Sequence, residues 1–344
     1  ISQAAAHHAL ASCDTRTSAV PCELDDRSSY RVPGAHRPSG MIGQESLKNP
    51  RLSVIVACTH SRLDLELVLS SLHGQEGADG LEIIVVDSSG DEAANQSIVQ
   101  DEGVLTLRFP RGTPLPALWG AGIRQSRGAI IAVTDACSVP DRRWVLSTQA
   151  AHESSDLIVG GAVDPMPQRS LVDWAAYFCE YGQFMLPLTG GDVSELPGNN
   201  IAFKRAALDK GTQFVEQRFW KTYWCRALQQ EGVQLRSVPS MVVYDRKSYR
   251  LLPFLVRRYH HGRCFAGMRI TQVPPVIRVL YALGTPLLPV LFMRRIAGPI
   301  MQKRRYLPQF MCSLPVSILA VVSWSWGEFC GYLAGPGRSC EFIQ

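Results

Sequence analysis

The sequence lacks the short motifs that identify several large classes of nucleotide-binding protein. No strand-like run is followed by a GxGxxG turn, which argues against a dinucleotide-binding Rossmann enzyme, and no GxxxxGK[ST] segment occurs, which excludes a P-loop ATPase or GTPase. Zinc-knuckle and RNP patterns are also missing, and a net charge of +5 is modest for 344 residues. We therefore expect no nucleic-acid partner.

Paired cysteine motifs are absent as well. None of the ten cysteines belongs to a CxxC pair, and several lie in strongly apolar runs, where cysteine behaves as a small buried hydrophobe. We therefore expect reduced thiols in a cytosolic compartment rather than a disulfide framework.

Residues 1–48 show neither apolar periodicity nor a secretory hydrophobic stretch, so we expect no signal peptide. They are interpreted either as a disordered extension or as a stretch that precedes the true start of translation at Met41. The whole chain is 46% hydrophobic and 19% charged, which suits a globular core rather than wholesale disorder.

From residue 51 onward, short apolar runs alternate with helical patterns. Runs typical of strands buried on both faces occupy residues 52–58, 81–86, 104–109 and 129–134. Helical patterns between them cover residues 63–72, 92–101 and 116–126. Further alternating elements continue to residue 244. This order predicts an α/β domain over residues 49–248, with a mostly parallel sheet flanked by helices.

After residue 248 the chain becomes basic and apolar together. Residues 249–344 predict a basic juxtamembrane helix and two hydrophobic helices, at 276–292 and 310–334, separated by a loop rich in arginine and lysine. Their lengths favour a membrane-associated pair that either spans the bilayer or lies in its interface, with the cationic loop on the cytoplasmic side. The alternative is a helical cap on a soluble domain.

Polar clusters stand where three of the predicted strands end, at residues 58–62, 87–91 and 134–137. In an open parallel sheet, ligands bind in the crevice beyond the carboxyl ends of the strands. Asp87 and Asp135 each end an apolar run, and a carboxylate there accepts hydrogen bonds from a base or a ribose. A single such carboxylate is often only a helix N-cap, but two at one crevice favour a ligand site.

The ordered set of motifs resembles the family 2 glycosyltransferases. The segments that carry the resemblance are residues 54–75, 82–91, a DXD-like stretch at 134–144, and 197–205, and together they extend over residues 50–250. The resemblance implies a GT-A fold of the nucleotide-diphospho-sugar transferase type. It also implies an inverting hexosyltransferase-like enzyme of polysaccharide or cell-envelope biosynthesis, which moves a sugar from a nucleotide-diphosphate sugar to a lipid-linked or polysaccharide acceptor at the cytoplasmic face of the cell membrane.

The resemblance implies a nucleotide-sugar site built from five residues. Asp87 would contact the base or the ribose, with Thr59, Arg62 and Asp91 nearby. Asp135 would approach the ribose and the metal-bridged diphosphate.

The resemblance also implies a catalytic base and a metal site. Glu216 lies near the place of the family's base, although it also suits the start of a helix as a favourable charge. Asp135 and Asp245 would hold a divalent cation, Mg²⁺ or Mn²⁺, on the diphosphate. The sequence departs from the family pattern at Cys137, which replaces the second acid of the DXD motif and is a poor ligand for a hard cation.

Two other clusters have competing interpretations. The basic run 257–263 could bind the diphosphate, but a juxtamembrane patch for anionic lipid headgroups is favoured. The aromatic residues of 219–224 could stack on a sugar, but core packing is favoured. For the whole chain, the alternative to an enzyme is a non-catalytic nucleotide-sugar-binding or scaffold subunit of a glycan-assembly complex. A third alternative is a nucleotidyltransferase. That activity would need a Gly-rich, basic phosphate loop near the first strand, and residues 58–62 do not supply one.

Overall fold

A mixed sheet organises the molecule. The computed structural model describes residues 49–59, 62–90, 103–166, 169–210, 218–270 and 273–342, without the side chains of Arg62 and Leu63. All of them belong to one unit, Arg31–Gln344. Within these residues the sheet has nine strands, of which eight run in the order β3-β2-β1-β4-β8-β6-β9-β5. The predicted α/β class is therefore confirmed.

The first four strands in the spatial order are parallel and come from the apolar runs. They are β1 (Leu52–Cys58), β2 (Leu81–Asp87), β3 (Val104–Arg108) and β4 (Ile130–Asp135). Strand β1 is buried along its whole length because alternate side chains enter two separate cores, one on each face of the sheet. Helices α2 (Arg62–His73) and α4 (Leu115–Gln125) follow β1 and β3 along the chain.

The other half of the sheet contains all of its antiparallel pairings. Strand β8 (Ile201–Lys204) runs antiparallel to both β4 and β6 (Ile158–Pro165). Strand β9 (Leu235–Asp245) is parallel to β6, whereas the short strands β5 (Ser138–Pro140) and β7 (Gly191–Val193) pair antiparallel with β9. The sheet is therefore mixed, and its parallel character is concentrated in the strands whose apolar runs are clearest.

Three further helices belong to the sheet domain. They are α5 (Trp144–Ala151), α6 (Leu171–Tyr181) and α7 (Lys221–Gln230). Helix α6 begins at a capping box, in which the Ser170 hydroxyl and the Asp173 carboxylate each accept a hydrogen bond from the other residue's backbone N–H. Short 3-10 turns follow α6 and β8, at Gly182–Phe184 and Arg205–Asp209.

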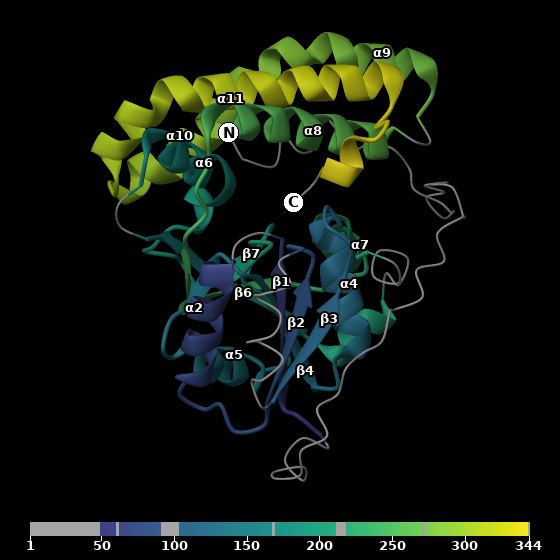
Figure 1. The fold of residues 1–344 in the computed structure, drawn as a ribbon. Coiled ribbons are helices and arrows are strands. Elements are labelled where there is room, and N and C mark those ends of the chain that lie inside the picture. The colour runs from purple at the N-terminus through teal and green to yellow at the C-terminus, as the bar shows by residue number, and fades with distance from the viewer. Residues whose placement is uncertain are drawn as a thin grey trace. The chain divides into compact units, whose positions relative to one another are not determined.

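The C-terminal residues form a helical layer, which we define as α8 (Leu251–Arg269), α9 (Pro275–Gly284), α10 (Leu288–Lys303) and α11 (Leu307–Ala334). A 3-10 turn joins α9 to α10, and another, η5 (Ser339–Phe342), ends the described chain. Helix α11 packs along α8 and α6, and α9 and α11 lie on the side of α8 that faces away from the sheet (Figure 1).

Glycines allow α8 and α11 to approach closely. A Cβ atom on Gly262 would collide with the carbonyl oxygen of Trp324, and one on Gly327 would collide with the carbonyl oxygen of Tyr259. Only hydrogen at these positions permits contact between the two helix backbones.

Two stretches of the helical layer, Pro275–Lys303 and Leu307–Ala334, are long and apolar enough to cross a membrane, judged by length and composition. The first is 11% buried and the second 28% buried over its most apolar window. The predicted pair of long apolar helices is therefore present, and most of its apolar surface is uncovered.

Basic residues of α10 and of the turn between α10 and α11 bind the sheet domain. Arg305 forms an ion pair with Asp164 at 2.7 Å, Arg295 pairs with Glu195, and Lys303 donates hydrogen bonds to the carbonyl oxygens of residues 183 and 185. Because these cations have acidic or carbonyl partners on the domain, they attach the helical layer to it.

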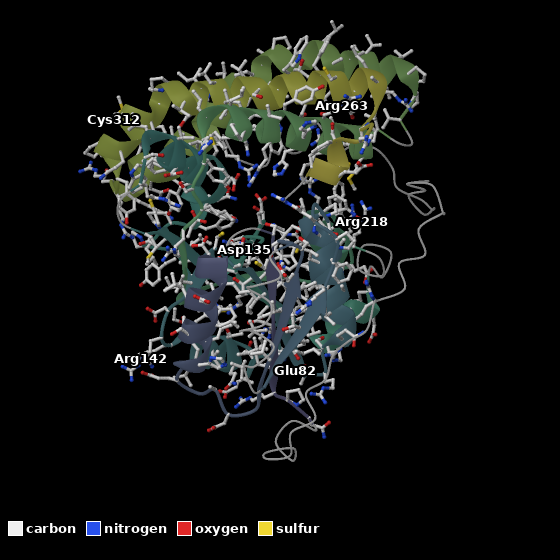
Figure 2. All side chains as sticks on the ribbon, viewed as in Figure 1. Glu82, Asp135, Arg142, Arg218, Arg263 and Cys312 are labelled. Carbon is white, nitrogen blue, oxygen red and sulfur yellow. A yellow bond between two sulfur atoms is a disulfide. The ribbon has the colours of Figure 1, made fainter. Side chains whose placement is uncertain are left out.

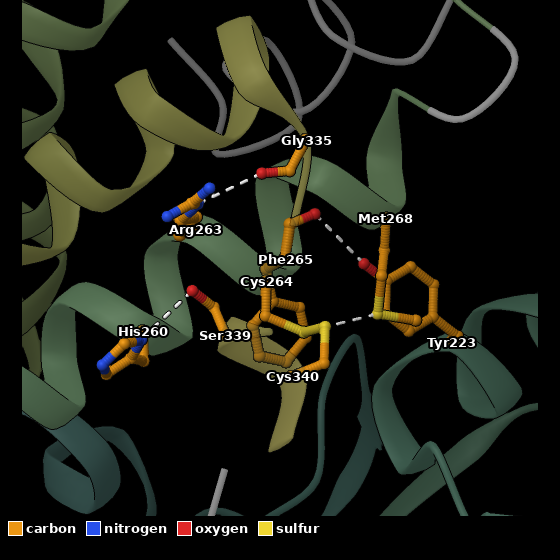
Figure 3. Close-up of a disulfide and its surroundings, with 9 residues drawn as sticks. All are labelled: Tyr223, His260, Arg263, Cys264, Phe265, Met268, Gly335, Ser339 and Cys340. Carbon is orange, nitrogen blue, oxygen red and sulfur yellow. Dashed lines mark hydrogen bonds between the residues drawn. A yellow bond between two sulfur atoms is a disulfide. The ribbon is translucent and has the colours of Figure 1, made fainter. Parts of the chain in front are cut away.

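The expectation that all thiols are reduced is wrong for one pair. Cys264 of α8 and Cys340 of η5 form a disulfide, with Cα atoms 5.0 Å apart, across 76 residues of chain (Figure 3). Nearby, Arg263 donates to the carbonyl oxygen of Gly335, and His260 hydrogen-bonds to Ser339. The sequence could not reveal this pairing because it arises only when the chain after α11 folds back onto α8.

Candidate active site

A cavity of about 750 Å³ lies where strands β1 and β4 end. One side is formed by the residues that follow these strands, and the other by residues 246–250, the first half of α8 and Phe342. The residues from the strand ends are Ala57, Thr59, Asp135, Ala136 and Cys137. The cavity therefore occupies the position at which open α/β sheets bind ligands, and α8 of the helical layer forms part of its wall.

Asp135 is the acidic centre of this cavity. It is 5% exposed, and its Oδ1 accepts hydrogen bonds from the Ser138 hydroxyl at 2.7 Å and from the Cys137 backbone N–H at 3.1 Å. Its Oδ2 lies 2.7 Å from the ammonium of Lys247. In Figure 2, Asp135 lies at the end of the sheet that faces the helical layer. Its carboxylate is thus held from one side and neutralised from the other.

Lys247 is held by aromatic and acidic groups together. Its ammonium donates to the Tyr181 hydroxyl at 2.7 Å and lies 5.1 Å from the centre of that ring. Burial alone lowers the pKa of Lys247, but the nearby Asp135 carboxylate and the neighbouring tyrosines more than offset this, and the pKa lies well above its usual value. Lys247 is therefore a permanent cation in the wall of the cavity.

Asp245, at the end of β9, has a cation of its own. Its Oδ2 lies 2.6 Å from the guanidinium of Arg169, and both side chains are almost fully buried. Burial raises the pKa of Asp245 to about 6, although Lys247 and Arg169 act in the opposite direction. Arg169 also donates to the backbone carbonyl of Lys247 at 3.0 Å. Asp245 and Arg169 therefore support the segment that carries Lys247.

Asp87 ends β2 and lies beside the cavity rather than in its lining. It is buried, it pairs in register with Cys58 of β1, and it accepts a hydrogen bond from the Ser89 backbone N–H at 2.9 Å. Thr59, one residue beyond Cys58, lines the cavity. The ends of β1 and β2 are therefore neighbours.

Three of the predicted site residues lie wholly or partly outside the described residues. They are Asp91, Glu216 and the side chain of Arg62, whose backbone begins α2. Their roles remain predictions.

Several polar residues support the site that were not singled out from the sequence. Asn199 donates to the Ser138 hydroxyl at 2.8 Å, and the Trp119 indole N–H donates to the carbonyl oxygen of Thr134 at 2.8 Å. Asn199 therefore reaches Asp135 through Ser138. The Asn-Asn pair in the stretch 197–205 was the available signal, because two adjacent amides at the start of an apolar strand need buried partners.

The interpretation of residues 257–263 as a patch for lipid headgroups is wrong for its arginines. Arg257 pairs with Glu180 at 2.8 Å and lines the cavity, and Arg258 is buried with its guanidinium 4.3 Å from the Trp324 ring centre. Arg263 donates a hydrogen bond to the carbonyl oxygen of Gly335, just after α11. These cations face protein because α8 lies between the sheet domain and α11.

The expected core role of the aromatic cluster is confirmed for two of its members. Phe219 and Trp224 are fully buried, with ring centres 5.3 Å apart, and both pack against Phe203 of β8. Their rings are therefore not free to stack on a sugar.

The arrangement does not fit a divalent cation held by Asp135 and Asp245. Each carboxylate already has a cationic side chain within 2.7 Å, Lys247 or Arg169. Burial raises the pKa of the Cys137 thiol, which favours its neutral, weakly coordinating form. Within the described residues, no group of three or more His, Cys, Asp or Glu side chains is placed to hold a metal ion.

The site and the fold together define an α/β protein with a ligand cavity at the carboxyl edge of its sheet. The sequence model described as "Glycosyl transferase family 2" matches residues 53–212. The chain therefore contains a region, residues 53–212, that is similar to the glycosyl transferase family 2 domain. No curated relative matches it at a significant level.

Two solved structures are similar to this chain. The mannosyltransferase PcManGT from Pyrobaculum calidifontis, in complex with GDP-Man and Mn²⁺, is 17% identical with a TM-score of 0.47, and the match covers 84% of this chain and 86% of that one. GalNAc-T7 with UDP, GalNAc and Mn²⁺ is 16% identical with a TM-score of 0.45, and the match covers 59% of this chain and 45% of that one.

Proposed function

We propose that this chain is an inverting hexosyltransferase that uses a nucleotide-diphosphate sugar and acts on a lipid-linked or polysaccharide acceptor at a membrane surface. The observation that carries the proposal is the cavity at the carboxyl edge of the sheet, where Asp135 and Thr59 face a wall of basic residues. An acidic floor suits ribose hydroxyls, and a basic wall suits a diphosphate.

The basic wall comes from one short stretch of chain. Arg246, Lys247, Arg250 and Arg257 all line the cavity. Two of the arginines have acidic partners, Asp64 at 3.4 Å and Glu180 at 2.8 Å, which hold them in place without removing their remaining donors. A nucleoside diphosphate is an anion whose size and charge match this surface.

Inversion requires a single displacement at the anomeric carbon. The acceptor hydroxyl forms the new bond to that carbon, the bond to the β-phosphate oxygen breaks, and a base takes the hydroxyl proton. Glu216 is our candidate for that base.

Membrane association follows from the apolar surface of the helical layer. Side chains spaced as stripes on α9 and α11 are exposed, among them Val279, Leu280 and Leu283, and Ile318, Val322 and Trp326. A surface of this kind marks a membrane or protein contact. Because α11 packs along α8, and α8 carries the cavity's basic residues, we propose that the layer lies in the interface rather than spanning the bilayer. The helical layer would lie on the cytoplasmic face of the cell membrane.

Donor binding is tested by calorimetry on the full chain in detergent, with UDP and with GDP. We expect micromolar binding of one nucleotide, weakened at least about tenfold by Asp135→Asn, because a charge-assisted hydrogen bond is lost. Asp87→Ala should act in the same direction. Asp192→Asn is the control, since that carboxylate is 60% exposed and pairs with Arg236 away from the cavity. Absence of binding by both nucleotides would refute the proposal.

Membrane association is tested by vesicle co-sedimentation. Leu280→Glu with Leu283→Glu should reduce binding to anionic vesicles, because both side chains are exposed, at 60% and 71%. Leu67→Glu on α2 is the control, since it adds one charge at an exposed leucine outside the helical layer. If vesicle binding falls equally in the two variants, the exposed apolar side chains of α9 are not the surface that contacts the membrane.

A non-catalytic nucleotide-sugar-binding subunit is the second candidate, and Cys137 favours it, because that residue stands where the family has an acid. The two candidates differ in turnover. The measurement is the release of nucleoside diphosphate from a nucleotide-sugar donor in the presence of membrane lipid extracts. If the chain binds the nucleotide but releases none, the result would support the non-catalytic binding subunit.

A further inference from the structure

Both strand-end carboxylates that the family pattern would give to a metal are neutralised by cations of the chain itself. Asp135 pairs with Lys247 at 2.7 Å, and Asp245 pairs with Arg169 at 2.6 Å. The two pairs differ in their surroundings. Arg169 and Asp245 are 4% and 2% exposed and neither lines the cavity, whereas Lys247 and Asp135 both line it.

Lys247 retains bonding capacity toward the cavity. An ammonium has three N–H donors. One of them goes to the Tyr181 hydroxyl, and the Asp135 carboxylate is an ion-pair partner at 2.7 Å. The side chain is 15% exposed, and its exposure is toward the space that it lines. A donor that is not used by Tyr181 therefore suits an oxygen of a bound anion.

We propose that Lys247 takes the place of the divalent cation in this chain, contacting the diphosphate of the donor and stabilising it as it leaves. The proposal rests on the proposed function. When the bond between the anomeric carbon and the β-phosphate oxygen breaks, the electron pair stays with that oxygen and the diphosphate gains one negative charge. A fixed ammonium beside that oxygen stabilises the charge without any change in its own protonation.

Arg169 is a positioning residue in this scheme. Its guanidinium bridges the Asp245 carboxylate and the backbone carbonyl of Lys247, and therefore fixes the chain at the residue that carries the ammonium. Cys137 is consistent with the replacement of a metal ion by Lys247. A neutral thiol at that position leaves Asp135 free to pair with Lys247.

The test is calorimetry on the full chain in detergent, with UDP and GDP, in EDTA and in Mn²⁺. We expect the preferred diphosphate to bind in EDTA, with an affinity that Mn²⁺ changes by less than about threefold. Lys247→Met should weaken diphosphate binding by about 10- to 100-fold, the usual range for a lost charge-assisted hydrogen bond. It should weaken binding of the corresponding monophosphate by less than about threefold, because the β-phosphate is missing.

Two further variants keep the result interpretable. Lys247→Arg retains the charge and should recover most of the affinity, whereas Lys210→Met removes a lysine that pairs with Glu231 outside the cavity and should change nothing. The double variant Lys247→Met with Cys137→Asp should acquire a requirement for Mn²⁺, because two adjacent carboxylates are then free of a protein cation.

The outcomes separate the two proposals. Diphosphate binding that occurs only with Mn²⁺, or equal losses of diphosphate and monophosphate affinity in Lys247→Met, would overturn the role of Lys247 and leave the transferase intact. If neither nucleotide binds in any condition, the proposed function fails and this inference fails with it. If Lys247→Met does not fold, the comparison of EDTA with Mn²⁺ on the unaltered chain still decides.

Discussion

Two buried carboxylates at opposite ends of the parallel strands are paired in similar ways but have different surroundings. Glu82 is 3% exposed and lies 2.8 Å from Arg127, and Asp135 is 5% exposed and lies 2.7 Å from Lys247. Figure 2 shows them at the two ends of the sheet. Glu82 also accepts from the Ser53 hydroxyl and the Arg127 backbone N–H, and it is not among the residues that line the cavity at the carboxyl edge.

The comparison teaches that burial and ion pairing do not by themselves mark a functional carboxylate. At the amino edge the strands and their helices close around Glu82, so the pair serves stability. At the carboxyl edge a 750 Å³ cavity intervenes between the strand ends and the helical layer, so the Asp135 pair is available to a ligand. The edge of the sheet, rather than the type of pair, separates the two roles.

The largest effect is expected from Glu82→Ala. We expect the free energy of unfolding to fall by about 2–4 kcal/mol, below the value for a fully buried pair because the Arg127 side chain is 47% exposed and regains water. Nucleotide affinity should stay within twofold. Chemical denaturation and calorimetry on the same preparation measure both. A stability loss as large in Asp135→Asn would erase the distinction between the two edges.

The pH dependence of stability gives a second, comparable effect. Burial lowers the pKa of His152, which is 6% exposed at the end of α5, to about 4. The neutral imidazole is favoured in the folded protein, so its contribution is present above pH 6.5 and is lost as the pH falls through 4. The shift corresponds to about 3 kcal/mol. Denaturation curves from pH 7 to pH 4 should show a shallower decline for His152→Gln, and an identical slope would contradict this.

The smallest effect concerns closure of the carboxyl edge by the helical layer. Gly327→Leu should lower the free energy of unfolding by about 1–3 kcal/mol, because the added side chain separates α11 from the backbone of Tyr259 on α8. Nucleotide affinity should also fall, since α8 lines the cavity.

Gly298→Ala is the matched control for Gly327→Leu. Apart from the neighbouring residues and backbone of α10, no atom lies within 4 Å of the position that a Cβ would take on Gly298, so the change should leave the contact between α8 and α11 and nucleotide binding unaltered. Thermal unfolding and calorimetry check both variants. A harmless Gly327→Leu would mean that the cavity does not depend on the contact between α8 and α11.

The sequence predicted the parallel half of the sheet well because its strands are continuous apolar runs, such as Leu52–Cys58, that are buried on both faces. The strands of the other half were harder to identify. Strand β5 has only three residues and gives no clear pattern, and the run that predicts a strand at residues 238–244 covers only part of β9. Their pairing depends on partners that are distant in the sequence.

The candidate site was predictable in part for a related reason. Asp87 and Asp135 end strong strand patterns, and the parallel pairing of β2, β1 and β4 brings their ends to one edge. Lys247, Arg169 and Tyr181 could not be found in this way, because they reach Asp135 and Asp245 from segments with no local signal of such a role.

The sequence by itself determined the α/β class, the order of the parallel strands' apolar runs, the two long apolar helices and the acids at the strand ends. These features depend on local periodicity, which a chain carries whatever its tertiary contacts. The tertiary structure decided that Lys247 neutralises Asp135, that basic residues of the helical layer bind the domain, and that Cys264 pairs with Cys340. Each of these depends on a distance between residues far apart in the chain, and such distances are fixed only when the helices pack against the sheet and against one another.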